Sequence, residues 1–171
     1  MKIIGKYIDD QYPNTGITHT RKTVRAIVMN EDGNIALHHL LRDDKFGHRD
    51  YFETPGGGVD KGETLLEALR RELKEELGVT VKDIIPLGRV IDYYNLLNQR
   101  NSIYYYFCKV DSYGEKNFQG SESTLIESTK WVSLSKAKEL YENMTKEPLE
   151  NLVRQRELPV IELVISTNIP K

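Results

Sequence analysis

The sequence predicts an α+β fold in which helices and a β-sheet form the layers of an α/β/α sandwich. Segments with strand character lie on both sides of a strongly helical segment, and the end of the chain is helical again. Of the 171 residues, 39% are hydrophobic, which is enough for one ordinary core. A mixed order of strands and helices is typical of layered domains. We therefore expect residues 1–171 to form a single domain.

The beginning of the chain predicts one separate strand and one hairpin. Residues 2–8 have strand character, and the turn-rich segment 12–16 separates them from the main body. We expect residues 1–22 to be an N-terminal extension whose strand is a candidate addition to the domain. Residues 23–29 and 34–41 are apolar runs joined by a turn that contains Asp-Gly, which indicates a β-hairpin.

A loop and a short strand come next. The charged segment 41–50 predicts the loop, and residues 51–54 predict the strand. This strand leads into the glycine-rich segment 55–58. Glycine tolerates backbone conformations that are closed to other residues. Three consecutive glycines before a helix therefore suggest a tight backbone path next to a ligand.

The helix predicted for residues 64–77 is marked at both ends. Thr64 is a good N-cap, and Glu67 stands three residues later as its capping-box partner. Gly78 follows the last helical residue, where glycine is the preferred residue. The limits of this helix are therefore encoded locally.

The remainder of the chain alternates between strands and helices. Within residues 102–110, Ile103, Tyr105 and Phe107 alternate with Tyr104, Tyr106 and Cys108, which is strand periodicity. Ser135 is a candidate N-cap. We expect strands at 81–94, 102–110 and 130–134, a loop at 96–101, and helices at 136–142 and from 147 to about 156.

Three carboxylates lie on one side of the predicted helix 64–77. At about 100° per residue, Glu72 and Glu76 fall inside the apolar arc and Glu75 falls at its edge. Two like charges four residues apart repel each other, and burial makes ionisation of either one costly. A divalent cation would compensate, and carboxylate oxygens suit Mg²⁺ or Mn²⁺. The alternative, that these glutamates simply form a solvated helix surface, stays open at this point.

The same residues resemble the Nudix box, Gly-x5-Glu-x7-Arg-Glu-U-x-Glu-Glu-x-Gly-U, where U is a bulky apolar residue. A chance match is on the order of one in ten million at ordinary residue frequencies. The match has no departure and consists of Gly57, Glu63, Arg71, Glu72, Leu73, Glu75, Glu76, Gly78 and Val79.

The resemblance to Nudix hydrolases implies a Nudix fold, with a mixed β-sheet between helices and the box as a loop–helix–loop. It implies that Glu63 and Arg71 are mainly structural and pair to hold the loop against the helix. A divalent cation, Mg²⁺ or Mn²⁺, is then expected on four groups, which are the carboxylates of Glu72, Glu75 and Glu76 and the backbone carbonyl of Gly56.

The implied reaction is attack of water on a phosphorus atom of a nucleoside diphosphate linked to a group X. A metal ion can lower the pKa of that water, and a base must take its proton. Glu75 is the candidate base on the helix. Glu122 is the candidate on a later loop, followed by Glu127. For Glu122, the alternative of an ordinary surface-loop carboxylate stays open.

Other candidate substrate contacts come from the strands and the glycines. Arg25 is a candidate phosphate ligand because arginine binds phosphate in a bidentate way, and Gly57 and Gly58 are candidates for close backbone approach to the substrate. His38 and His39 are neighbours on a strand and must point to opposite faces, so we interpret them as structural. The candidates for stacking on a base, with ordinary packing as the alternative, are Tyr93, Tyr94, Tyr104 and Tyr106.

The substrate is predicted from missing subfamily signatures. Those typical of ADP-ribose, NADH and coenzyme A hydrolases are absent. This leaves a (deoxy)nucleoside triphosphate pyrophosphatase as the expected function, with a dinucleoside polyphosphate or nucleotide-sugar hydrolase as an alternative. A non-catalytic nucleotide sensor or scaffold is a second alternative. An isoprenoid diphosphate isomerase would need a cysteine and extra histidines in the cleft, whereas Cys108 lies on a predicted strand.

The composition narrows the partners. The chain has 24 Lys and Arg against 26 Asp and Glu, a formal net charge of -2, so we expect no nucleic-acid partner. No apolar segment approaches the roughly 20 residues that span a bilayer, and the first ten residues do not resemble a secretory signal. We expect a cytoplasmic protein that binds a small nucleotide-like diphosphate, and we leave a homodimer open.

Overall fold

The computed structural model describes residues 1–8, 12–44, 47–116, 126–167 and 169. In chain order its elements are β1 (Ile3–Ile8), β2 (His19–Met29), β3 (Ile35–Asp44), β4 (Gly47–Glu53), α1 (Leu65–Leu77), β5 (Val79–Tyr94), η1 (Asn95–Leu97), β6 (Gln99–Tyr113), β7 (Ile126–Val132), α2 (Leu134–Glu142) and α3 (Pro148–Ser166).

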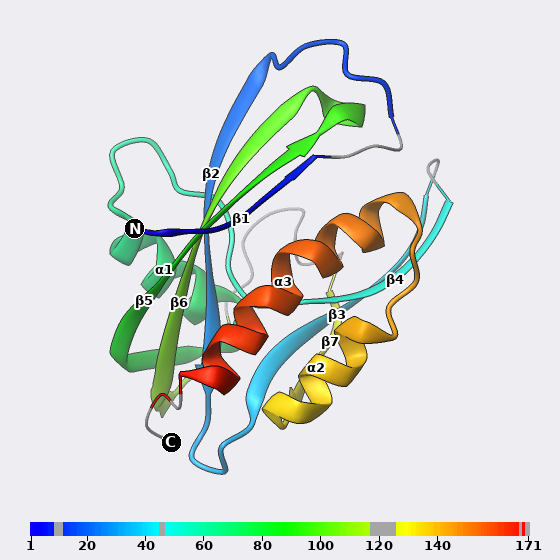
Figure 1. Ribbon diagram of the computed structural model, residues 1–171. Helices are drawn as coiled ribbons and strands as arrows, with labels where there is room; N and C mark the ends of the chain where they lie inside the picture. Colours follow the sequence, from blue (N-terminus) through cyan, green and yellow to red (C-terminus); the bar gives the residue numbers. More distant parts are fainter. Residues whose placement is uncertain (9–11, 45–46, 117–125, 168, 170–171) are drawn as a thin grey trace.

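The strands form one mixed sheet in the order β1-β5-β6-β2-β3-β4, and β7 pairs with β3. The pairs β1–β5 and β2–β6 are parallel, while β5–β6, β3–β4 and β3–β7 are antiparallel. Helix α1 lies on one side of this sheet and α2 and α3 on the other (Figure 1). The predicted α/β/α arrangement with a mixed sheet is therefore confirmed.

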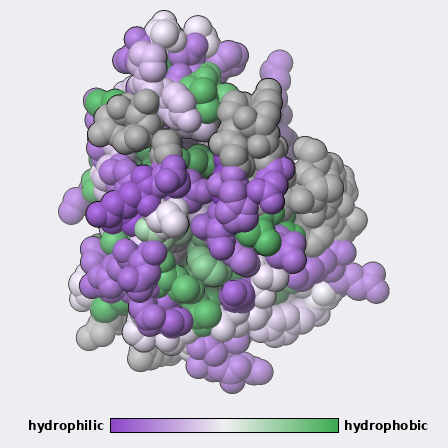
Figure 2. Space-filling model, turned by 90° about the vertical axis from the view of Figure 1, so that its right-hand side faces the viewer, coloured by the Kyte–Doolittle hydropathy of each residue, from purple (hydrophilic) through white to green (hydrophobic). Residues whose placement is uncertain are grey.

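Each face of the sheet carries its own apolar core, because successive side chains of a strand point to opposite faces. Ile27 and Phe107 pack with α2 and α3. Their neighbours Val28 and Cys108 pack with α1 instead. On the side that carries β4 and the start of α3, hydrophilic residues predominate and apolar residues occur in small patches (Figure 2). Most of the large apolar side chains are thus used in the two cores.

The prediction of a loop over residues 41–50 is wrong for the residues that the structure describes there. Residues 41–44 belong to β3 and residues 47–50 to β4, and the two strands pair from His38–Glu53 to Asp44–Gly47. The charges lie on an exposed ribbon, where His39 Nε2 is 2.6 Å from Asp50 Oδ1 and His48 Nδ1 is 2.8 Å from Asp43 Oδ1. Polar side-chain pairs across two strands stabilise a ribbon, so a high density of charged residues did not indicate a loop here.

Other boundaries also differ from the predictions; for example, the strand expected at 130–134 is β7, Ile126–Val132. The loop expected at 96–101 is shorter than predicted. A 3-10 helix ends at Leu97, Asn98 follows in a left-handed conformation, and β6 begins at Gln99. The cap of α2 is Ser133 rather than Ser135, since Ser133 Oγ accepts from the backbone N–H of Lys136 at 3.1 Å. Helix α3 continues far beyond residue 156.

Helix α3 contains Pro159, although proline in a helix interior removes one hydrogen bond. Val160, Ile161 and Val164 follow it, and all three are buried against the sheet. Tertiary packing of an apolar helix face can outweigh an unfavourable local propensity. The long α3 is therefore a consequence of the core and not of its local sequence.

The hairpin predicted for residues 23–29 and 34–41 is only partly formed. β2 and β3 pair only at Met29–Ile35. Beyond this pair the glycine-rich segment lies along β2: the N–H of Val24 donates to Gly57 O at 2.9 Å, and that of Ala26 donates to Pro55 O at 3.0 Å. The hydrogen bonds that β3 would have made are thus given to the segment that leads into α1.

Candidate active site

The glycines before α1 are required by close contacts. Gly56 has φ of 132°, and a Cβ there would lie 2.1 Å from the carbonyl oxygen of Val24. A Cβ on Gly57 would lie 2.6 Å from the carboxylate of Glu72. A larger residue would have to displace the backbone of β2 in the first case and a carboxylate of α1 in the second. The glycine segment therefore fixes the distance between β2 and the acidic helix.

Helix α1 has the ends and the buried face that the sequence predicts. Thr64 and Glu67 form a complete capping box, and Gly78 closes the helix with φ of 69°. Glu72 is only 4% exposed and Glu76 only 7%, so both carboxylates are in the buried arc. The alternative of a solvated acidic surface is excluded for these two residues.

Glu76 is held by two donors from other elements. Its Oε2 lies 3.0 Å from Nε2 of the buried His38 and accepts from the backbone N–H of Gly56 at 2.8 Å. The other ring nitrogen of His38 is 3.0 Å from Thr129 Oγ1 on β7. His38 and His39 do point to opposite faces, but His38 contacts the acidic helix directly. Interpreting it as merely structural missed this contact.

Arg71 connects the glycine segment to the acidic face. Its Nε and Nη2 donate to Glu63 at 2.9 and 3.0 Å, and Nη2 also donates to Gly58 O at 2.9 Å. Its Nη1 is 2.8 Å from Glu72 and 3.3 Å from Glu75. Hydrogen bonds to Glu63 and Glu72 raise the pKa of Arg71, and the bond from Arg71 lowers the pKa of Glu63. Glu63 and Arg71 therefore form the ion pair expected from the motif.

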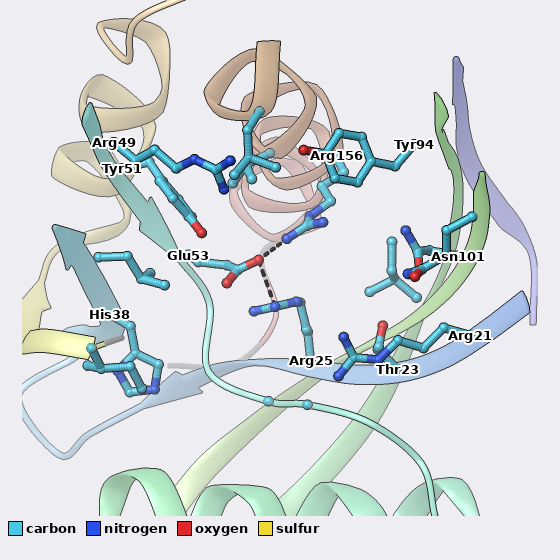
Figure 3. Close-up of a pocket in the computed structure, with 18 of the residues that line it drawn as sticks. Arg21, Thr23, Arg25, His38, Arg49, Tyr51, Glu53, Tyr94, Asn101 and Arg156 are labelled. Atoms are coloured by element: carbon cyan, nitrogen blue, oxygen red, sulfur yellow. Dashed lines mark hydrogen bonds and ion pairs between the residues drawn. The ribbon is translucent and has the colours of Figure 1, made fainter. Parts of the chain in front are cut away.

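A cavity of about 330 Å³ opens beside this helix, between the sheet and the start of α3 (Figure 3). Both Gly56 and Gly57 line it, and Glu76 is the carboxylate that α1 contributes. Four arginines come from β2, β4 and α3. The charged and polar lining residues are Arg21, Thr23, Arg25, His38, Arg49, Glu53, Glu76, Gln99, Asn101 and Arg156. A pocket rich in arginine suits an anionic ligand.

A row of buried ion pairs forms part of the pocket wall (Figure 3). Glu53 accepts from Arg25 Nη2 at 2.6 Å and is also paired with Arg156. Behind them Glu157, which is fully buried, accepts from Thr54 Oγ1 at 2.8 Å and from Tyr105 OH at 2.9 Å. Burial lowers the pKa of Arg156 to about 10, so this arginine still carries its charge at neutral pH.

The predicted site residues are only partly brought together. Arg25, Gly56, Gly57 and Glu76 line the cavity. Gly58 instead bridges to Thr23 on β2. Glu72 and Glu75 lie on the same helix face but share Arg71 rather than lining the cavity. Glu127 is exposed on β7, and Glu122 lies outside the described residues.

Arg25 does not stand free for a phosphate, because its guanidinium group already contacts Glu53 and the carbonyl oxygen of Thr54. The sequence analysis missed Arg21, Arg49 and Arg156. A signal existed for Arg21 alone, since it lies two and four residues from Thr23 and Arg25 and so shares a strand face with them. Of the four candidate tyrosines, only Tyr94 lines the cavity. Tyr106 is buried against α1.

The acidic residues of α1 fit a divalent cation by their chemistry. Within the described ranges, no three His, Cys, Asp or Glu side chains are already close enough together to hold a metal ion. Even so, Glu72 and Glu76 are buried carboxylates one helical turn apart. Gly57, which has no side chain, lies directly against the carboxylate of Glu72. Such hard oxygen donors beside an open cavity match what Mg²⁺ and Mn²⁺ prefer.

Comparison with known proteins identifies relatives of this chain. The NUDIX domain model matches residues 19–153. An RNA pyrophosphohydrolase of Wolbachia pipientis subsp. Culex pipiens is 36% identical over 76 residues, which is 44% of each chain. An 8-oxo-dGTP diphosphatase of Haemophilus influenzae is 47% identical over 54 residues, 32% of this chain and 38% of that protein. The chain thus covers less than half the length of these curated relatives.

Solved structures share the fold at lower identity. A NUDIX hydrolase from Nitrosomonas europaea has a TM-score of 0.65 at 19% identity, and the match covers 86% of this chain and 90% of that protein. A MutT NUDIX hydrolase from Burkholderia pseudomallei has a TM-score of 0.57 at 23% identity, with 85% and 98% covered. In the described ranges, no helix has both the length and the apolarity needed to cross a bilayer. Because the family model spans most of the sequence and the fold agrees, the chain belongs to the Nudix hydrolase family.

Proposed function

We propose that this protein is a Mg²⁺- or Mn²⁺-dependent hydrolase that cleaves the diphosphate linkage of a nucleoside diphosphate bound to a group X. One observation carries the proposal: the buried acidic face of α1 adjoins a cavity lined by arginines, and Glu76 belongs to both. A diphosphate needs cationic groups along its oxygens, and the reaction needs a divalent cation at the bond that breaks.

Glu72, Glu75 and Glu76 are the residues that would hold the cation, with the backbone of Gly56 next to them. When bound, the cation lowers the pKa of a water molecule and neutralises charge that develops on the phosphate oxygens. His38 and the N–H of Gly56 keep the Glu76 carboxylate turned toward the cavity. Arg71 keeps Glu72 and Glu75 on the same side of the helix.

The proton of the attacking water needs a carboxylate base within hydrogen-bond reach. Glu75 is our candidate, because it is the least buried of the three helix glutamates and shares Arg71 with Glu72. Glu122 remains a second candidate for this role. Arg21 and Arg49 line the cavity on opposite sides of the ion pairs of Glu53 (Figure 3), so a bound chain of phosphates would run between cationic walls.

A nucleoside triphosphate is the substrate that we propose first. Of the relatives' names, 8-oxo-dGTP diphosphatase describes an enzyme that acts on a nucleoside triphosphate, and RNA pyrophosphohydrolase describes one that acts on RNA. A small mononucleotide suits a cavity of about 330 Å³ and a chain with a net charge of -2. Dinucleoside polyphosphates and nucleotide sugars remain alternatives within the same chemistry.

The test is a panel of nucleoside triphosphates, dinucleoside polyphosphates and nucleotide sugars, each with Mg²⁺ or Mn²⁺, in which released phosphate and pyrophosphate are measured. We expect turnover of at least one triphosphate and none when the cation is chelated. The competing candidate is a nucleotide sensor without activity. Tight nucleotide binding by calorimetry with no turnover of any compound would favour that sensor and contradict the proposal.

A further inference from the structure

One end of the sheet face that lines the cavity is polar, although the rest of that face is core. On β6 the apolar residues Phe107, Tyr105 and Ile103 are followed, at the same two-residue spacing, by Asn101 and Gln99. Side chains at this spacing share one face. The change from apolar to polar therefore occurs along a single strand, where the cavity replaces the core.

The paired strands continue this polar end across the sheet. Asn101 is in register with Arg21 on β2 and with Asp92 on β5. The next row pairs Gln99 with Tyr94 of β5. All of these except Asp92 line the cavity, and Asp92 lies buried behind Asn101.

A chain of hydrogen bonds fixes how the two amides are turned. Asn101 Nδ2 donates to Asp92 Oδ1 at 2.5 Å, so Asn101 Oδ1 must face the other way, where it accepts from Gln99 Nε2 at 2.5 Å. An ionised carboxylate accepts hydrogen bonds only, which sets the direction of the whole chain. In the described part of the protein, Gln99 has no other hydrogen bond that occupies its carbonyl oxygen or its second N–H.

A second observation marks this half of the cavity as a place for a ligand. Thr23 is only 7% exposed, yet its hydroxyl group has no hydrogen-bond partner among the described residues. A buried polar group without a partner is costly. Thr23 lies on the cavity wall between Arg25 and Arg21 (Figure 3), so a ligand with polar atoms would supply what is missing.

We propose that the polar end of the cavity binds the nucleobase of the substrate, and that Gln99, held in one orientation by Asn101 and Asp92, selects the base. The free carbonyl oxygen and N–H of Gln99 form a donor–acceptor pair like the one that amide side chains use to read a base edge. The Tyr94 ring and Leu97 supply the flat and apolar surfaces beside it. This proposal rests on the proposed function.

The test compares Gln99→Leu and Gln99→Glu with wild type on ATP, GTP, CTP and UTP, which differ only in the base. Inorganic tripolyphosphate serves as the substrate without a base. Gln155→Leu, the same change on α3 outside the cavity lining, is the matched control. Circular dichroism and the melting temperature of each variant establish that it is folded.

We expect kcat/KM of wild type to differ between bases by at least about tenfold, since a site that hydrogen-bonds its substrate discriminates strongly. Gln99→Leu should lower kcat/KM for the preferred base by about 10- to 100-fold and make the four values similar. Gln99→Glu, which loses the donor, should change the order of preference. Turnover of tripolyphosphate and the behaviour of Gln155→Leu should stay at the wild-type level.

Binding separates this inference from the proposed activity. Calorimetry with the four nucleoside monophosphates and metal-free protein measures base preference without any hydrolysis. A preference that disappears in Gln99→Leu supports the base site even if no triphosphate is cleaved. Equal binding and turnover of all four bases by wild type overturns it. So does a preference that Gln99→Leu leaves intact.

Discussion

Two groups of buried charges lie on opposite sides of the same cavity, and they are compensated differently. On α3, Glu157 is surrounded by donors from Thr54 and Tyr105 and by nearby arginines. On α1, the buried Glu72 contacts Arg71 and the buried Glu76 contacts His38. In the first group one carboxylate is approached by two arginines, whereas in the second a single arginine, Arg71, is shared by Glu63, Glu72 and Glu75.

The buried charged residues of α1 and α3 are therefore expected to have different roles. A buried ion pair is destabilising unless the geometry satisfies every partner. The carboxylate of Glu157 has such partners, so we expect the α3 group to form a rigid wall of the cavity. Carboxylates that are buried with too few cations can be stabilised by a bound ion instead. Substitutions should therefore affect stability on the α3 side and chemistry on the α1 side.

The largest effect is expected from Glu76→Gln. The change removes the negative charge where α1 meets the cavity, and a loss of several kcal/mol of metal-dependent stabilisation corresponds to about a 1,000-fold drop in kcat. Stopped assays on the best triphosphate give the rate, and circular dichroism verifies the fold. Glu67→Gln on the same helix is the control, since glutamine also serves in a capping box. An active Glu76→Gln protein would contradict the role given to this carboxylate.

On the α3 side, Glu157→Leu should mainly destabilise the protein. It removes one of the carboxylates that face Arg25 and Arg156 and leaves the hydroxyl groups of Thr54 and Tyr105 without their buried acceptor. Removing one partner from a buried ion-pair group typically costs about 3–5 kcal/mol. The free energy of unfolding in urea measures the effect. Glu162→Leu on the same helix is the control: Glu162 forms an exposed pair with Lys138 at 3.1 Å, which is worth about 0–1 kcal/mol. Equal losses in the two variants would remove the distinction between the buried group and the surface.

Asp92 should make stability depend on pH. Burial raises the pKa of its carboxyl group from 3.8 to about 6, so the folded protein binds a proton more tightly than the unfolded chain does. The free energy of unfolding should therefore fall as pH rises from about 4 to about 6, by about 1–3 kcal/mol for a shift of this size. Asp92→Asn should remove that part of the slope. An identical slope in wild type and Asp92→Asn would show that this carboxyl group does not titrate in the window.

The smallest effect is expected from Arg71→Lys. Lysine keeps the charge but loses the fork that binds Glu63 and Glu72 together. Because the Arg71 side chain is 30% exposed, we expect a loss of only about 1 kcal/mol in the free energy of unfolding. Arg70→Lys, next to it on α1, is the control. A larger loss in Arg70→Lys would place the stabilising contact outside the motif.

Local signals made α1 predictable from the sequence. Its two caps lie within a few residues of its ends, and the positions of Glu72 and Glu76 follow from helical periodicity alone. The alternation along β6 likewise predicted a strand. These features depend on neighbours in the chain, so they do not require knowledge of the rest of the fold.

The pocket wall could not be predicted in this way. Glu53 meets Arg156 across 103 positions of the chain, and only the packing of α3 on the sheet brings them together. The charged ribbon of β3 and β4 was missed because its stability comes from pairs such as His39–Asp50 across two strands. Residues whose role depends on a distant partner carry no signal in a single sequence.

The position of Arg156 has a consequence for how this domain can vary. The NUDIX match ends at residue 153, three residues before the arginine that completes the wall around Glu53. One wall of the cavity is thus completed by a side chain that lies outside the matched stretch of polypeptide. Replacing the final helix by that of another family member should therefore change this wall while the acidic face of α1 and Gln99 on β6 are retained.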